Sequence, residues 1–307
     1  MRLIQGLDAS VDLSGAVVVG DFLVIGADEG HLLQVLRRDQ GGERWQIQQK
    51  LPLAKRNQET DIEAITYGNG YLYVIGSHSF RRRQMKPHLS RGRNLERLLE
   101  TDGESPRNRL YRLAFDAESG RIGEIRHMDL SKRLRKDPLL GLFWGIPGKE
   151  NGIDIEGLAF RDGNLHLGFR GPVLGENYVP VMSLEFTRAK HYELRFVRLD
   201  GQGIRDMCSL ERGFMVLSGP VNDAPGPFCL WWWDGEDQIP DKGRQVVPAV
   251  LLDEVSTRGG AKAEGLALLE QTARQAKVLV VYETGTSAQA VTMQVDLPAL
   301  HQESISS

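Results

Sequence analysis

The amino-acid sequence predicts an all-β protein, a five-bladed β-propeller of four-stranded blades. One phrase recurs five times, and each copy precedes a turn and an apolar strand, which is typical of a repeat architecture. The chain also begins with residues that resemble the ends of the repeats, which indicates how a ring would close. The five copies are D-L-S-G-A at residues 12–16, D-I-E-A-I at 61–65, D-I-E-G-L-A at 154–159, R-D-M-C-S at 205–209 and K-A-E-G-L-A at 262–267.

Each repeat contains the pattern of a blade, with a tight turn between its first two strands. Gly20-Asp21, Gly68-Asn69-Gly70 and Asp162-Gly163 mark such turns, because these residues adopt the backbone angles of short hairpins. We place the blades at residues 14–53, 61–130, 154–200, 204–252 and 262–297 of a single domain that spans 1–307. The expected strands are 14–20, 21–26, 31–37 and 45–53; 63–67, 71–76, 109–116 and 122–130; 155–160, 164–169, 179–186 and 192–199; 206–210, 214–217, 228–234 and 245–251; and 264–269, 277–282 and 290–297.

Blade five lacks one strand, which the beginning of the chain can supply. The other blades finish on a strand that ends in leucine, often beside an aspartate, as in Asp129-Leu130 and Leu199-Asp200. Residues 2–8 end in the same way, with Leu7-Asp8. We expect them to complete blade five, because a closed ring removes sheet edges that would otherwise pair with other chains.

Two insertions interrupt the regular spacing of the repeats. Residues 80–108 lie between the second and third strands of blade two and begin with three arginines, and a short helix is expected at 94–100. Residues 131–152 lie between blades two and three and contain the apolar stretch 139–144. Both belong to loops on the same face of a propeller, so we expect them over the mouth of the central channel, as binding loops or lids. The basic stretch could instead be a solvated loop, and residues 301–307 are expected to be a flexible tail.

Composition excludes several classes of protein. The net charge is −3, so no general basic field indicates a nucleic-acid-binding protein. No apolar run is long enough to span a membrane, and the first residues lack the apolar centre of a signal peptide. The two cysteines are too few for a disulfide framework. We expect a monomer in the cytoplasm, unless a leader has been removed.

The recurring phrase places an acidic or hydroxyl side chain at equivalent points of the inner strands. Crowded carboxylates raise one another's pKa, and a bound cation relieves the repulsion. Oxygen ligands suit a hard ion, and Ca²⁺ tolerates a loose ring better than Mg²⁺ does. The alternative is structural, with each acid accepting hydrogen bonds from the backbone of a neighbouring blade. The predicted ring consists of Ser14, Glu63, Glu156, Asp206 and Glu264.

The loops that follow the second strands offer candidate catalytic residues at the same mouth. Arg81 and Arg170 could bind an anionic group, because guanidinium pairs with carboxylate or phosphate through two hydrogen bonds. His78 could act as a general acid or base. The alternatives are a structural loop histidine and, for Arg170, an ion pair with one of the ring acids.

Three motifs together resemble a bacterial family known as a domain of unknown function. They are the D-[IL]-E-[GA]-[LI] phrase, I-G-S-H-S at residues 75–79 and L-G-F-R-G-P at residues 167–172. The resemblance extends from Asp12 to about Leu297. More distantly, the chain is similar to the esterase-like phytase propellers and to the calcium-activated nucleotidases (apyrases). The latter resemblance implies a Ser/Glu ring around a central Ca²⁺, with the pattern weakest at Asp206.

Two functions remain open at this stage. The first is a binding module whose acidic ring holds a divalent cation and whose mouth takes a small anionic ligand or a protein partner. The second is a Ca²⁺-dependent hydrolase of phosphate esters or anhydrides, in which the ion polarises phosphorus and His78 or a ring carboxylate activates water. The sequence favours the binding module, because it contains no complete catalytic set, and a fold alone does not choose between functions.

Overall fold

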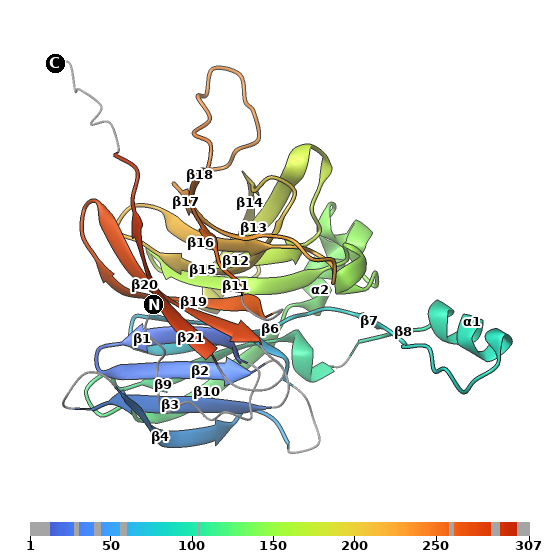
Figure 1. Cartoon of the computed structure of the whole chain (residues 1–307), viewed down its shortest axis with the longest axis horizontal. Coiled ribbons are helices and arrows are strands. Elements are labelled where there is room, and N and C mark those ends of the chain that lie inside the picture. Colours follow the sequence, from blue (N-terminus) through green and yellow to red (C-terminus); the bar gives the residue numbers. More distant parts are fainter. Residues whose placement is uncertain are drawn as a thin grey trace.

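The computed structural model describes residues 13–27, 31–39, 44–55, 60–103, 105–257, 261–283 and 289–299. It confirms the predicted fold class: the protein is an all-β, five-bladed β-propeller, with few helices (Figure 1). Antiparallel sheets of adjoining strands form the blades, and the first strands of the five sheets contact one another around the ring.

The order of strands in the sheets follows the chain, except where the long insertion interrupts blade two. Blades one to four each contain four strands, and the described part of blade five contains three. The strands are β1 (Leu13–Val19), β2 (Phe22–Ala27), β3 (Leu32–Arg38) and β4 (Trp45–Pro52); β5 (Ile62–Gly68), β6 (Tyr71–Gly76), β9 (Arg109–Phe115) and β10 (Ile122–Asp129); β11 (Asp154–Arg161), β12 (Asn164–Gly171), β13 (Tyr178–Leu184) and β14 (Tyr192–Arg198); β15 (Gly203–Ser209), β16 (Phe214–Gly219), β17 (Phe228–Trp233) and β18 (Val250–Val255); and β19 (Lys262–Gln271), β20 (Gln275–Glu283) and β21 (Gln289–Asp296).

Apolar side chains fill the space between every pair of adjacent blades. Separate clusters join blades one and two, two and three, three and four, and four and five. A further cluster joins Leu13 and Ile25 of blade one to Leu279 and Val281 of blade five. The ring is therefore closed by side-chain packing. The predicted closing strand at residues 2–8, and the predicted tail at 301–307, lie outside the described residues.

The innermost strand of each blade carries an irregularity at the recurring phrase. There the pairing with the second strand shifts, so that one or two residues bulge out of the ladder. The shifts fall between Leu13 and Ala16, Ile62 and Ala64, Ile155 and Gly157, Ile204 and Asp206, and Ala263 and Gly265. A bulge redirects a side chain, which explains how five similar phrases can aim side chains at one central space.

One expected strand lies elsewhere. The last strand of blade four was expected at residues 245–251, whereas β18 runs from Val250 to Val255. Pro248 stands within the expected strand, and proline has no N–H to donate to a ladder. Residues 244–249 therefore form an irregular segment before the strand begins.

The long insertion forms an arm that projects from the ring (Figure 1). The arm consists of β7 (Arg81–Arg82), β8 (Thr101–Asp102) and helix α1 (Arg91–Leu99), and η1 (Ser105–Asn108) leads back to blade two. The helix begins three residues before the expected 94–100, because the hydroxyl of Ser90 caps it by accepting from the N–H of Arg93 at 3.4 Å.

The second insertion packs against the propeller. It contains α2 (Ser131–Lys136), η2 (Leu140–Phe143) and η3 (Gly148–Glu150). In the apolar stretch 139–144, Leu140 is fully buried and the ring of Trp144 meets that of Phe80 edge-on at 5.2 Å. Only Leu142 of this stretch is highly exposed, at 71%.

The short helices η4 (Gly175–Asn177) and η5 (Phe186–Arg188) belong to blade three. In the described part of the chain, no helix is both long and apolar enough to cross a bilayer.

Candidate functional site

A cavity of about 520 Å³ opens where the inner strands meet the two insertions. Its wall combines side chains of the bulges with side chains of the loops and of the arm base, and most of them are polar or charged. The residues around it are Leu13, Ser14, Asp61, Glu63, Ser79, Phe80, Arg81, Arg82, Gln84, Pro147, Lys149, Glu150, Glu156, Arg170, Arg205, Asp223, Lys262, Glu264 and Glu283. Four of the five predicted ring residues are thus brought together.

Arg205 occupies the bulge of blade four, at the position that the glutamates hold in blades two, three and five. The shift in β15 falls between Ile204 and Asp206, which leaves Arg205 as the bulged residue. The side chain of Arg205 is buried, and its Nη1 donates to Oε2 of Glu156 and to Oε2 of Glu264, both at 2.8 Å. The ring of acids predicted from the sequence is therefore a ring of three glutamates, one serine and one arginine.

Asp206, which the sequence predicted as a ligand, belongs to the backbone packing. Its Oδ1 accepts from the N–H of Met207 and its Oδ2 from the N–H of Leu266 in blade five, each at 2.7 Å. Burial raises its pKa well above the usual range, although these backbone donors act in the opposite direction. Asp206 thus joins blades four and five in the structural role that was the alternative for the ring acids.

Ser14 is at the expected position, but its hydroxyl is used within the fold. It is buried in β1, and its Oγ donates to the backbone carbonyl of Ile62 in blade two. The side chain of Ser14 therefore joins blades one and two at the wall of the cavity.

Glu264 is buried at the floor of the cavity. Burial raises its pKa from 4.5 to about 8, against the lowering effect of Arg205, and the nearby Glu156 raises it further. Desolvation is thus the main cause of the shift, and it disfavours the ionised form of this carboxyl.

Arg170 lies beside two acids of β11. Its Nη2 donates to Oδ2 of Asp154, and its Nη1 is 2.6 Å from Oε1 of Glu156. This is the ion pair that was the alternative to ligand binding for Arg170. Burial nevertheless raises the pKa of Asp154 from 3.8 to about 6, with Arg170 opposing the rise.

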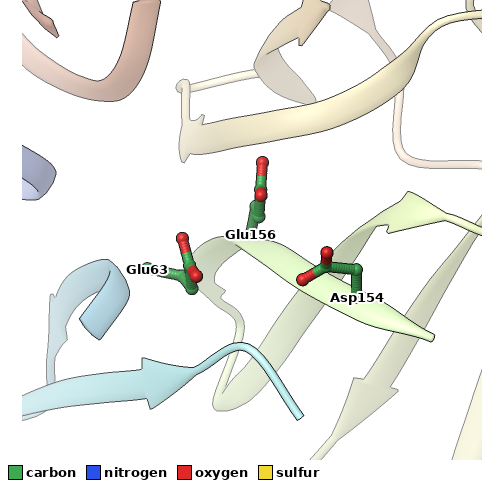
Figure 2. Close-up of side chains that lie close together, drawn as sticks. All are labelled: Glu63, Asp154 and Glu156. Atoms are coloured by element: carbon green, nitrogen blue, oxygen red, sulfur yellow. The ribbon is translucent and has the colours of Figure 1, made fainter. Parts of the chain in front are cut away.

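Three carboxylates converge where blades two and three meet (Figure 2). Glu63 comes from β5, and Asp154 and Glu156 come from β11; one oxygen of each lies within 4.8 Å of the others. Asp154 is buried, and its Oδ1 finds no hydrogen-bond donor among the described residues. We call these three residues the acidic cluster. An all-oxygen donor set of this kind suits a hard divalent cation.

Arg81 lies on the wall of the cavity, paired with an aspartate. Its Nη2 is 2.7 Å from Oδ1 of Asp61, a buried residue at the start of the second phrase. The other oxygen of Asp61 accepts from Ser77 and from Nη1 of Arg107, the latter at 3.3 Å. Asp61 therefore fixes the base of the arm to blade two.

His78 does not lie on the wall of the cavity. Its side chain is fully buried in a left-handed backbone conformation, with Nδ1 2.7 Å from the carbonyl oxygen of Gly76. Burial lowers its pKa from 6.5 to about 4. The geometry is that of the structural loop histidine, the alternative to a general base.

Further cations reach the rim of the cavity, and each is balanced by a nearby acid. Lys149 Nζ is 2.7 Å from Oδ1 of Asp223, and Lys262 Nζ is 3.3 Å from Oε2 of Glu283. Both pairs are partly exposed, so each contributes little to stability and can exchange for ligand contacts.

The sequence contained signals for two residues that the predicted site omitted. Asp154 stands two positions before Glu156, and Asp61 stands two positions before Glu63, so the D-x-E spacing marked both acids. Arg205 was not predicted as a ring residue from the sequence, because the repeats were aligned on the neighbouring acid, Asp206.

A sequence family described as "Protein of unknown function (DUF3616)" matches residues 12–296, which include every blade described above. The chain belongs to this family. No curated protein matches the chain.

Three solved structures are similar to this protein at low sequence identity. The structure of U3-55K is 11% identical, with a TM-score of 0.43, over 92% of this chain and 77% of that one. "Bacteroides ovatus Xyloglucan PUL GH43B" is 11% identical, with a TM-score of 0.45, over 93% of this chain and 52% of that one. The computationally designed Ika8 protein is 10% identical, with a TM-score of 0.31, over 95% of this chain and 99% of that one.

Proposed function

We propose that this propeller is a binding module whose central cavity holds a divalent cation on the acidic cluster and a small anionic ligand above it. The observation that carries the proposal is the convergence of three carboxylates in the acidic cluster, where Oδ1 of the buried Asp154 has no hydrogen-bond donor among the described residues. Burial raises the pKa of Asp154 and of Glu264, and a bound cation would offset this cost of ionising them.

Counting charges gives the same conclusion. Glu63, the two acids of β11 and Glu264 are four carboxylates, and Arg170 and Arg205 are two guanidinium groups. If all are ionised, the set carries a formal charge of −2, which one divalent cation balances. Burying uncompensated charge is expensive, so a bound cation would stabilise the ionised state of the site.

The residues that would hold the ion are Glu63, Asp154 and Glu156. The unsatisfied Oδ1 of Asp154 supports this choice, because a buried carboxylate oxygen without a donor lacks its expected partner. We favour Ca²⁺ over Mg²⁺, since Ca²⁺ accepts irregular sets of oxygen ligands. When bound, the ion would supply a positive centre for an anionic ligand.

Basic residues on the wall and rim of the cavity support the proposal of an anionic ligand. Arg81, Lys149 and Lys262 approach the cavity from three separate segments of the chain. Their present partners are acids at distances of 2.7 to 3.3 Å, and a phosphate or carboxylate could replace these acids as the partner.

The hydrolase alternative receives no support from His78, one of its two candidate bases. The histidine is buried, has a lowered pKa and lies off the cavity wall. We therefore advance the binding module alone.

Calorimetric titration of chelator-treated protein with Ca²⁺ and with Mg²⁺ tests the cation site. We expect saturable Ca²⁺ binding that Glu63→Gln abolishes. Asp223→Asn is the matched control, because it removes one carboxylate from the same cavity but outside the acidic cluster. Absence of binding in the wild type, or equal loss in both variants, would overturn the proposal.

A further inference from the structure

The outer part of the projecting arm is held together by hydrogen bonds within the arm. Asn94 ties it together by accepting from the N–H of Lys86 at 2.9 Å and donating to its carbonyl at 3.0 Å. Arg97 donates to the carbonyl of Gln84 at 2.5 Å. These hydrogen bonds join helix α1 to the segment that precedes it in the arm.

Helix α1 presents an apolar face that nothing in the described chain covers. None of its residues is buried, and Leu99 is 85% exposed. Leu95 lies four residues before Leu99, and Arg91 four residues before that, so the three share one side of the helix. Helices of this length gain most of their stability from packing an apolar face, which indicates a surface that becomes covered.

The charge of the arm restricts what covers it. Residues 81–100 contain seven arginine and lysine residues and two glutamates. A surface that fits the helix therefore combines apolar side chains with acids.

The outer strand of blade four offers that combination. β18 is the last strand of its sheet, so its outer edge has no strand partner among the described residues. Leu251 on this strand is 53% exposed, and Val250 beside it is also exposed. Asp253 and Glu254 follow on the same strand and are exposed as well. We call these four residues the β18 edge.

The neighbouring blade shows what a covered edge looks like in this protein. The loop between β17 and β18 crosses to β14, where Oδ1 of Asp237 accepts from the N–H of Phe196 at 2.9 Å. The N–H of Gln238 donates to the carbonyl of Phe196, also at 2.9 Å. The strands β4 and β10 also end their sheets, but on β18 two adjacent exposed apolar residues are followed by two exposed acids, which is the combination that suits the basic arm.

We infer that a second copy of this chain is the partner, with α1 of one copy docked on the β18 edge of another. Leu95 and Leu99 would cover Val250 and Leu251, and Arg91 would face Asp253 and Glu254. In Figure 1 the arm extends away from the ring and does not approach β18 of its own chain. Two copies can exchange arms reciprocally, which gives a closed dimer. This inference replaces the monomer expected from the sequence and does not depend on the proposed function.

Sedimentation velocity over a wide range of protein concentration tests the inference. We expect the wild type to dimerise, and we expect the double variant Leu95→Asp, Leu99→Asp and the variant Leu251→Asp to remain monomeric. Leu142→Asp is the control, because Leu142 is also an exposed leucine but lies outside both surfaces. Circular dichroism establishes that each variant is folded.

Mixing the two monomeric variants distinguishes the contact of α1 with the β18 edge from other ways in which two copies could associate. The arm variant retains its β18 edge and the edge variant retains its arm, so a mixture should form a heterodimer through one arm. A wild type that is monomeric at every concentration would overturn the inference, as would an arm variant that associates normally. If the wild-type protein binds vesicles that contain phosphatidylserine and does not self-associate, α1 is assigned to a membrane surface and the inference of a dimer is overturned.

Discussion

Arg205 has the effect of an internal cation among the ring acids. Buried between Glu156 and Glu264, it neutralises part of the charge that the bulged glutamates concentrate at the centre. The guanidinium group suits this place because it stays charged when buried and offers several donors in one plane.

Replacement of Arg205 by methionine should lower the free energy of unfolding by about 3–5 kcal/mol, because it leaves two buried carboxylates without their shared partner. Urea denaturation measures the change. Arg126→Met, which breaks an exposed pair with Glu124, should alter stability little. If the free energy of unfolding falls by the same amount in both variants, the buried ion pairs of Arg205 stabilise the fold no more than an exposed ion pair does.

Glu264 should make stability depend on pH. Its pKa is raised from 4.5 to about 8, so the folded state binds more protons than the unfolded state between these values, and stability falls as pH rises. Asp154 and Asp206 act in the same direction, whereas His78 and His166, lowered to about 4, act oppositely below pH 6.5.

The effect of Glu264 is therefore clearest between pH 6.5 and 8. Urea denaturation at several pH values should show a decline for the wild type in this window and a smaller decline for Glu264→Gln. An identical decline in both proteins would rule out Glu264 as the titrating group.

Residue types in the recurring phrase predicted Glu63, Glu156 and Glu264 but not Arg205. Alignment by charge matched Asp206 to the glutamates, and the small residue that follows each glutamate could not correct this, because blade four has no small residue at that position. Gly157 and Gly265 lie directly after the bulged glutamates, and Asp206 lies at their equivalent position. A three-dimensional register was needed to see this, because one residue of offset moves a side chain to the other face of a strand.

At the scale of elements, the glycine at the bulge of blades one, three and five sets how closely neighbouring blades approach. A Cβ on Gly15 would lie 2.9 Å from Cα of Ala64 in blade two, and one on Gly157 would lie 2.7 Å from Cγ2 of Ile204 in blade four. A Cβ on Gly265 would collide with the carbonyl oxygen of Ser14 in blade one. The glycine of the phrase is thus a packing requirement, and the acid before it is free to serve the site.

Gly265→Ala should destabilise the propeller by about 1–3 kcal/mol, because the backbone of blade one must move to admit the methyl group. Thermal unfolding followed by circular dichroism measures the effect. Gly175→Ala is the matched control, since a Cβ there meets nothing within 4 Å. Equal melting temperatures for Gly265→Ala and the wild type would show that blades one and five can move apart enough to admit the methyl group without loss of stability.

Most strands could be predicted because apolar alternation and glycine-rich turns are local signals. The arm and β18 were predicted less well, for physical reasons. A short helix with no buried residue leaves no periodic core pattern, and its start depends on the cap at Ser90. The start of β18 depends on Pro248, which the apolar pattern around it concealed.

At the scale of the whole molecule, five apolar clusters between blades make the ring one cooperative unit. The cluster that joins blades one and five means that no blade is terminal in its packing, even within the described residues. The repeat in the sequence predicted this closure, because a phrase that recurs in every blade gives each blade the same neighbours.

A bound cation should raise the stability of this unit. Any ligand that binds only the folded state adds about 2.7 kcal/mol at a concentration one hundred times its Kd. We expect the melting temperature of chelator-treated protein to rise on addition of Ca²⁺, and the rise to vanish in Asp154→Asn. A rise of equal size in that variant would place the ion elsewhere.

The five bulges do not carry equivalent side chains, because blade four places an arginine where three other blades place a glutamate. Arg205 pairs with Glu156 and Glu264, whereas the acidic cluster is made by residues of blades two and three. The arm begins on that same side, because Arg81 and Arg82 of β7 line the cavity. A ligand in the cavity would therefore contact the base of the arm directly, through Arg81 and Arg82. The propeller would thus bind its ligand between the ring and the arm, on one side of the central opening.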